Sequence, residues 1–211
     1  MLRETAIVCA IAALACSAQA SAAAAPNVTA AARPTAAPSL KNVRGKPAAP
    51  APRSASGCKG ADVIALDEPS RRRAKRVVLC LVNRERAARR IAILRVSPLL
   101  ARAAARYSTS MVQRQYFAHR SPAGDGVRHR TARTGYRRRG RATLLGETLA
   151  WGRDATATPT ELVTAFMRSP GHRRTMLSRR YRDIGVGIAL GAPAPDATGN
   201  AATLTIDFGR R

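Results

Sequence analysis

Aromatic residues, acidic residues and histidine are all scarce in this 211-residue chain. Aromatic side chains make up 4% of it, histidine occurs 3 times, and 12 Asp and Glu oppose 37 Lys and Arg. The core must therefore be built mostly from Val, Ile, Leu and Ala. The formal net charge of +25 predicts adhesion to anionic surfaces.

Several sequence patterns are also missing. Beyond the N-terminus, no run is long and apolar enough to span a bilayer, which argues against a membrane span in the mature chain. There is no Gly-x-Ser-x-Gly elbow and no His-Glu-x-x-His helix. Two common hydrolase signatures are thereby excluded.

The first 57 residues predict export rather than a folded domain. Residues 1–20 combine a short apolar run with a small-x-small site ending at Ala20, as a signal peptide does. An alternative is a lipid anchor on Cys16. Lipoprotein signals prefer Leu three residues before that cysteine, whereas this chain has Ala13 there, so a signal peptide is the first choice. Residues 21–57 are rich in Ala, Pro and Ser and have almost no large apolar side chains, so we expect a disordered linker.

Residues 58–211 are long enough for one domain with one core. Removal of the signal peptide leaves two cysteines, Cys58 and Cys80. In an exported chain an even pair favours one disulfide. The alternative is a free, buried Cys80, because that residue lies in an apolar run.

Periodicity predicts helices first and strands last. We expect helices from Pro69 to about Arg90, from the Ser97-Pro98 cap, and from the Thr158-Pro159-Thr160-Glu161 capping box. Apolar residues then alternate with a period of two over 184–190 and 204–208, and a third such strand covers 145–151. Helices followed by an antiparallel hairpin indicate an α+β fold.

Two of the three histidines lie in short patterns with a carboxylate between them. His119 precedes Ser121-Pro122, Glu147 follows a glycine, and His172 follows Pro170-Gly171. Two imidazoles and a carboxylate are enough to hold a metal or to move a proton. Unrelated polar residues, each bonded locally, are the simpler interpretation.

The surrounding motifs resemble the CAP superfamily, which includes cysteine-rich secretory, insect venom antigen and plant pathogenesis-related proteins, and in particular its bacterial secreted branch. Seven pieces follow the family's order over residues 77–209. They are Leu81-Val82-Asn83-Arg84-Glu85-Arg86, Met111, Tyr116-Phe117-Ala118-His119-Arg120-Ser121-Pro122, Gly135-Tyr136 with Gly146-Glu147, Ser169-Pro170-Gly171-His172-Arg173, Ile184-Gly185-Val186-Gly187 and Asp207-Phe208-Gly209. Arg90, Thr148 and Phe166 depart from the pattern, since the family commonly has Gly, Asn and Trp there.

The resemblance implies an α-β-α sandwich and places His119, Glu147 and His172 in a central cleft. Many relatives complete this set with a second acid, which the helix before His172 lacks near its end. His119 and His172, with Glu147, are thus candidate ligands for a divalent metal such as zinc. The same three residues could instead form a hydrogen-bonded cluster without a metal.

The sequence leaves two classes of function open. One is a secreted module that binds an envelope or extracellular ligand, such as a lipid, through this cleft. The other is a metal-dependent hydrolase or peptidase, for which Ser110, Ser121 and Ser169 are candidate nucleophiles.

A tract of arginines suggests a further type of partner. It comprises Arg128, Arg130, Arg133, Arg137, Arg138, Arg139 and Arg141, with no acidic residue among them. We expect this tract to bind anionic envelope polymers or lipids, whereas nucleic acid is an improbable partner for an exported chain. A solvated loop without a partner is the alternative.

Overall fold

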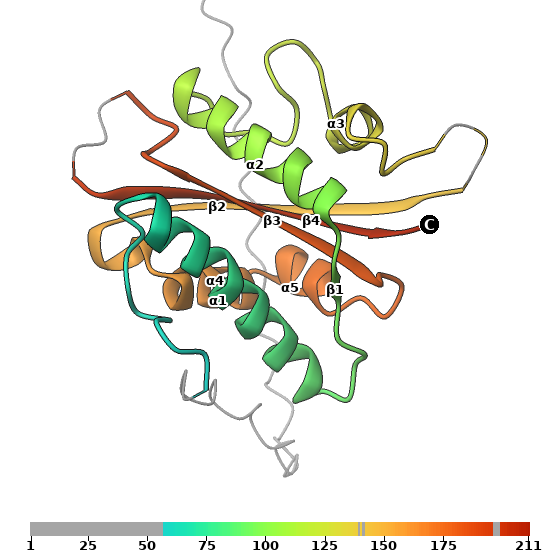
Figure 1. Cartoon of the computed structure of the whole chain (residues 1–211), viewed down its shortest axis with the longest axis horizontal. Coiled ribbons are helices and arrows are strands. Elements are labelled where there is room, and N and C mark those ends of the chain that lie inside the picture. The colour runs from blue at the N-terminus through green and yellow to red at the C-terminus, as the bar shows by residue number, and fades with distance from the viewer. Residues whose placement is uncertain (1–56, 139, 141, 196–198) are drawn as a thin grey trace, which may run out of the picture. The chain divides into compact units, whose positions relative to one another are not determined.

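A four-stranded sheet runs through the centre of the domain (Figure 1). The computed structural model describes residues 57–138, 140, 142–195 and 199–211, so the predicted signal peptide and almost all of the predicted linker lie outside the described residues. The strands occur in the order β1-β3-β4-β2. Their bounds are Arg95–Val96 (β1), Leu144–Arg153 (β2), Asp183–Leu190 (β3) and Ala201–Arg210 (β4).

The strand pairing follows from the period-two patterns. β4 pairs antiparallel with both β2 and β3, and β3 with β4 forms the predicted hairpin. β1 pairs in parallel with β3 through only two residues. Such a short strand carries no periodicity, which is why the sequence did not indicate it.

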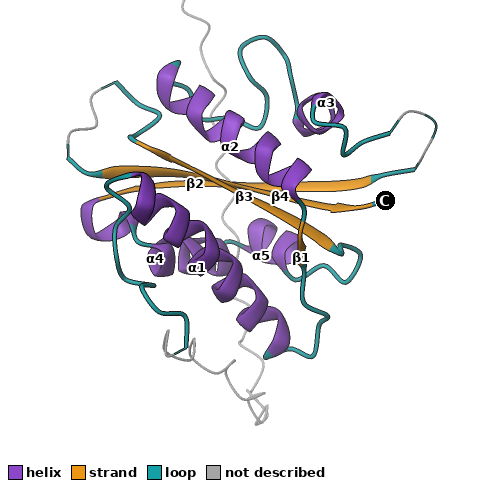
Figure 2. Cartoon of the chain, viewed as in Figure 1, coloured by secondary structure: helices purple, strands orange, loops and turns teal. Residues whose placement is uncertain are grey.

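Helices cover both faces of the sheet, giving the α-β-α arrangement that was predicted (Figure 2). On one face lie α2 and α3; on the other lie α1, α4 and α5 (Figure 1). Their bounds are Glu68–Ala87 (α1), Pro98–Gln113 (α2), Val127–Arg133 (α3), Pro159–Arg168 (α4) and Pro170–Met176 (α5), with a 3-10 turn, η1, at Asp154–Ala157.

Side-chain caps fix where the longer helices begin. Ser97 accepts a hydrogen bond from the Leu100 backbone at 3.4 Å, and Thr158 accepts one from Glu161 at 3.2 Å, as the sequence predicted. The first helix ends at Ala87, earlier than expected. Arg90 then adopts φ 55°, the left-handed conformation that explains why glycine is common at this position.

Small residues on β3 allow α2 to lie directly against the sheet. A Cβ atom at Gly185 would be 2.2 Å from the backbone nitrogen of Ala101, and one at Gly187 would be 2.2 Å from the carbonyl carbon of Ala104. The alternate residues Ile184 and Ile188 are buried in the main core on the other side. One face of β3 thus accommodates helix backbone, and the other contributes to the core.

A disulfide joins Cys58 to Cys80, as predicted. The two Cα atoms are 5.9 Å apart, and the bridge closes a span of 22 residues. Cys58 is part of the buried core, so the bridge attaches the segment before α1 to the middle of that helix. Among the helices that the structure describes, none is long and apolar enough to cross a membrane.

Candidate functional site

Glu147 is buried on β2, and 4% of its side chain is exposed. It is in phase with Leu149, which packs against Tyr107 and Met111 of α2, so both residues belong to the face beneath α2 and α3. In the sequence, Glu147 alternates in phase with Leu145, Leu149 and Trp151, which predicts that the rest of this face is apolar. That prediction is wrong. Asp207 lies opposite Glu147 in the β2–β4 register and therefore shares the same face.

His119 is bonded directly to this carboxylate. Its Nδ1 lies 2.8 Å from Oε1 of Glu147, although 28 residues separate them in the chain. The hydrogen bond to Glu147 raises the pKa of His119, while partial burial opposes that shift. Because 60% of the imidazole is exposed, its other nitrogen remains available to solvent.

Arg130, on α3, holds the other oxygen of Glu147. Its Nη2 bonds Oε2 of that carboxylate, and its Nη1 donates to the Asp125 carbonyl at 2.9 Å and to the His119 carbonyl at 3.3 Å. The guanidinium also lies 3.3 Å from the centre of the Tyr107 ring. One buried cation thus fixes the carboxylate and the backbone that carries His119.

The position of Arg130 corrects the expectation that every arginine of the tract is available to an anionic partner. It is 7% exposed and already paired, so it is not available to a polymer. Arg128 and Arg138 are exposed; Arg133 is exposed but bonds Asp125 at 2.7 Å. Arg139 and Arg141 lie outside the described residues.

Asp207 is a second carboxyl group in the same buried environment. None of the described side chains donates a hydrogen bond to either of its oxygens. Burial raises the pKa of Asp207 well above its usual range, and the nearby negative charge of Glu147 raises it further. A raised pKa favours the neutral form of this carboxyl, which needs no cationic partner of its own.

His172 lies on α5, on the other side of the sheet. Gly146 faces Thr175 of α5, and the neighbouring Glu147 points away from that helix. The imidazole packs edge-on against Phe166, with ring centres 5.1 Å apart. Burial lowers the pKa of His172, and the charge of His119 lowers it further.

The structure thus joins two of the three predicted residues. His119 and Glu147 are hydrogen-bonded, whereas His172 has no hydrogen bond to either of them in the part of the chain described. The charge of His119 contributes to the lowered pKa of His172, after the larger effect of burial. A single site formed by all three residues remains a prediction.

The arrangement does not fit a divalent cation. Across residues 57–138, 140, 142–195 and 199–211, no three His, Cys, Asp or Glu side chains come together as a metal site would require. Both oxygens of Glu147 are already used, one by His119 and one by the Arg130 cation. A zinc ion would have to displace a buried guanidinium to reach this carboxylate.

None of the predicted serine nucleophiles is paired with a histidine in the described structure. The Ser110 hydroxyl bonds the Tyr116 hydroxyl at 3.0 Å, and Ser121 accepts from the Asp125 backbone at 3.2 Å. Ser169 precedes α5 and makes no side-chain capping bond. A covalent mechanism through these residues therefore has no geometric support among the described contacts.

Two residues of this site, Asp207 and Arg130, were not predicted from the sequence, and the sequence contains a pattern that could have indicated only the first of them. Asp207 lies in a predicted strand at the alternate position to Ile206 and Phe208, so it had to face the other layer. Arg130 had no such signal, because it is one of several arginines in a short segment. Only the contacts of α3 distinguish it.

Comparison with known proteins gives a consistent result. The profile of the cysteine-rich secretory protein family (CAP) matches residues 79–200. The uncharacterized protein YkwD of Bacillus subtilis is 31% identical over 119 residues, which is 52% of this chain and 40% of YkwD. This chain therefore spans less than half of the length of that relative.

Two solved structures have a similar fold. An extracellular protein from Bacillus anthracis that contains an SCP domain gives a TM-score of 0.55 at 21% identity, covering 70% of this chain and 45% of that protein. An outer surface protein from Borrelia burgdorferi gives a TM-score of 0.53 at 18% identity, covering 69% of this chain and 96% of that protein. With the sequence profile matched over most of the folded part, the chain belongs to the CAP family.

Proposed function

We propose that this protein is exported and binds an envelope or extracellular ligand through the surface around His119. The observation that carries this proposal is an exposed imidazole held on a buried, fully engaged carboxylate. Export is supported by the Cys58–Cys80 disulfide, by the predicted signal peptide, and by the extracellular and outer-surface proteins that share the fold.

The chemistry of His119 favours binding a ligand with a hydrogen-bond acceptor. Because Glu147 raises its pKa, more of the imidazole carries a proton near neutral pH than an isolated histidine would. Glu147 holds Nδ1, so the remaining N–H can be directed at a ligand oxygen. The lowered pKa of His172 instead favours a neutral ring near that cationic group.

The same bond supports a hydrolase as a second candidate. A histidine fixed by a carboxylate can act as a general base toward water. Here, however, the charge of Glu147 is also neutralised by Arg130, which makes this carboxylate a weaker support for a basic imidazole. Binding without turnover therefore agrees better with these contacts.

A comparison of two histidine variants tests the proposal. His119→Ala removes the exposed imidazole, and His129→Ala is the matched control because that histidine is exposed on α3. Both proteins would be titrated with phosphatidylglycerol vesicles, with phosphatidylcholine vesicles and with purified peptidoglycan. A library of peptide and ester substrates would be assayed in parallel.

We expect saturable binding to at least one surface, weakened about tenfold by His119→Ala through loss of a charge-assisted bond and unchanged by His129→Ala. Equal effects of the two substitutions on every surface would refute the role of His119. Turnover that His119→Ala abolishes would identify the hydrolase instead.

A further inference from the structure

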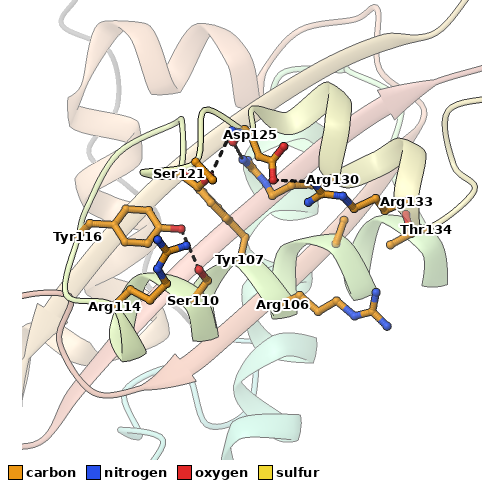
Figure 3. A pocket seen from close by; sticks show the side chains of 12 residues that line it. Arg106, Tyr107, Ser110, Arg114, Tyr116, Ser121, Asp125, Arg130, Arg133 and Thr134 are labelled. Carbon is orange, nitrogen blue, oxygen red and sulfur yellow. Dashed lines mark hydrogen bonds and ion pairs between the residues drawn. The ribbon is translucent and has the colours of Figure 1, made fainter.

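A small pocket lies between α2, α3 and the segment that joins them, and none of the predicted triad residues lines it (Figure 3). Its volume is about 220 Å³. Because typical ligand sites hold about 300–1,000 Å³, this pocket fits only a small molecule. Its lining includes four arginines (Arg106, Arg114, Arg130 and Arg133), and Tyr107, Ser110 and Tyr116 beside them.

Hydroxyl groups and one aromatic pair form the inner wall. The Tyr116 hydroxyl bonds Ser110, and the Tyr116 ring packs edge-on against Tyr107 at 6.0 Å between centres. Tyr107 is itself held by a bond from its hydroxyl to the Ala118 carbonyl. These contacts fix the wall before a ligand arrives, which reduces the entropy lost on binding.

The arginines of the pocket differ in what neutralises them. Arg130 is paired with Glu147, and Arg133 with Asp125 (Figure 3). For Arg106 and Arg114, by contrast, no carboxylate within the described residues lies at ion-pair distance; Arg114 only approaches the Tyr116 ring, 6.0 Å from its centre. Two arginines that line the pocket thus have no carboxylate partner, and of these Arg114 lies beside the Ser110 and Tyr116 hydroxyls (Figure 3).

We propose that this pocket binds a small hydroxylated molecule that carries an oxyanion, either a phosphate or a carboxylate. Guanidinium groups form paired hydrogen bonds with both kinds of oxyanion. The Ser110 and Tyr116 hydroxyls match a polyol or sugar body, and the limited volume excludes anything much larger than one sugar unit. This inference is independent of the proposed role of His119, which does not line the pocket.

The test is calorimetric titration with glycerol 3-phosphate and with glucuronate, which separate a phosphate from a carboxylate ligand, and with glycerol as the uncharged probe. The pocket variant is Arg106→Gln with Arg114→Gln. The matched control is Arg76→Gln with Arg102→Gln, which removes the same charge from exposed positions outside the pocket. Tyr116→Phe tests the hydroxyl without a change of charge.

We expect at least one of the two anions to bind with 1:1 stoichiometry at about 0.15 M salt, and glycerol not to bind. The pocket variant should lose about tenfold or more in affinity, Tyr116→Phe less than that, and the control about twofold or less. Absence of saturable binding for both anions would overturn the proposal. An equal loss in the pocket variant and the control would do the same, because it would indicate general attraction by net charge.

Discussion

Glu147 and Asp207 lie directly opposite each other on β2 and β4, so two carboxyl groups share one buried face of the sheet. The only cation that pairs with either of them in the described structure, apart from the imidazole of His119, is Arg130, which bonds Glu147. Two negative charges so close together would repel strongly, and protonation of Asp207 removes one of them. Burial and the charge of Glu147 thus both favour the protonated form of Asp207.

Asp207→Asn should change how stability depends on pH. The folded-state pKa of Asp207 is raised, so its contribution to stability is fully present below the unfolded value of about 3.9 and is lost as pH rises toward the raised pKa. Asn is neutral at every pH and can donate to Glu147. We therefore expect the variant to lose less stability than the wild type in thermal unfolding between about pH 5 and 9. Parallel curves for the two proteins would show that Asp207 is ionised in the fold.

Arg130→Met should destabilise the fold by about 3–5 kcal/mol, because it leaves the buried Glu147 carboxylate without its cation. Arg133→Met, on the same helix, is the control. It breaks an exposed pair with Asp125 and should cost about 1 kcal/mol or less. Urea unfolding of both variants measures the difference, and similar midpoints would contradict the assigned role of Arg130.

Removal of the disulfide by Cys58→Ser with Cys80→Ser should lower the free energy of unfolding by about 3 kcal/mol, because it frees a span of 22 residues in the unfolded chain. Urea unfolding of oxidised wild type and of the variant provides the measurement.

Intact mass of the secreted protein before and after reduction tests both the bridge and the predicted N-terminus at Ser21. A lipid on Cys16 or two free thiols would refute this prediction.

Replacement of Arg137, Arg138 and Arg139 with Gln should weaken binding to phosphatidylglycerol vesicles and reduce its dependence on salt. Exposed cations are screened strongly by salt, whereas Arg130 is buried and should contribute nothing to this dependence. Vesicle co-sedimentation at several salt concentrations measures both the binding and its salt dependence.

The control is the triple variant Arg72→Gln, Arg76→Gln and Arg102→Gln, which has the same net charge. An equal change in that protein would show that the tract has no special role.

Zinc should not bind stoichiometrically to the wild-type protein. The Glu147 oxygens are occupied, and the described residues bring no third ligand to the site. Calorimetric titration with Zn²⁺ near pH ~7.5, about one unit above the ordinary pKa of histidine, favours the neutral imidazoles that metal binding needs. Binding with 1:1 stoichiometry that His119→Ala abolishes would restore the metal hypothesis.

Local features of the sequence were sufficient for the long helices and strands, although not for β1 or α3. Ser97 and Thr158 are caps whose effect depends on the next three residues, and the alternation along β3 requires only a period of two. The Cys58–Cys80 bridge followed from the number of cysteines and from the inferred export. The inward orientation of Glu147 likewise followed from its phase with Leu149.

The tertiary structure alone decided the partners of each charged group. Arg130 looks like its neighbours in the sequence, and only the packing of α3 over the sheet buries it beside Glu147. Register places Asp207 opposite that carboxylate, and burial then raises its pKa. His172 lies on α5 and packs against Phe166, and its place in one site with His119 remains a prediction. The physical reason is that a short motif determines local geometry, whereas a pKa or an ion pair depends on residues brought together from distant parts of the chain.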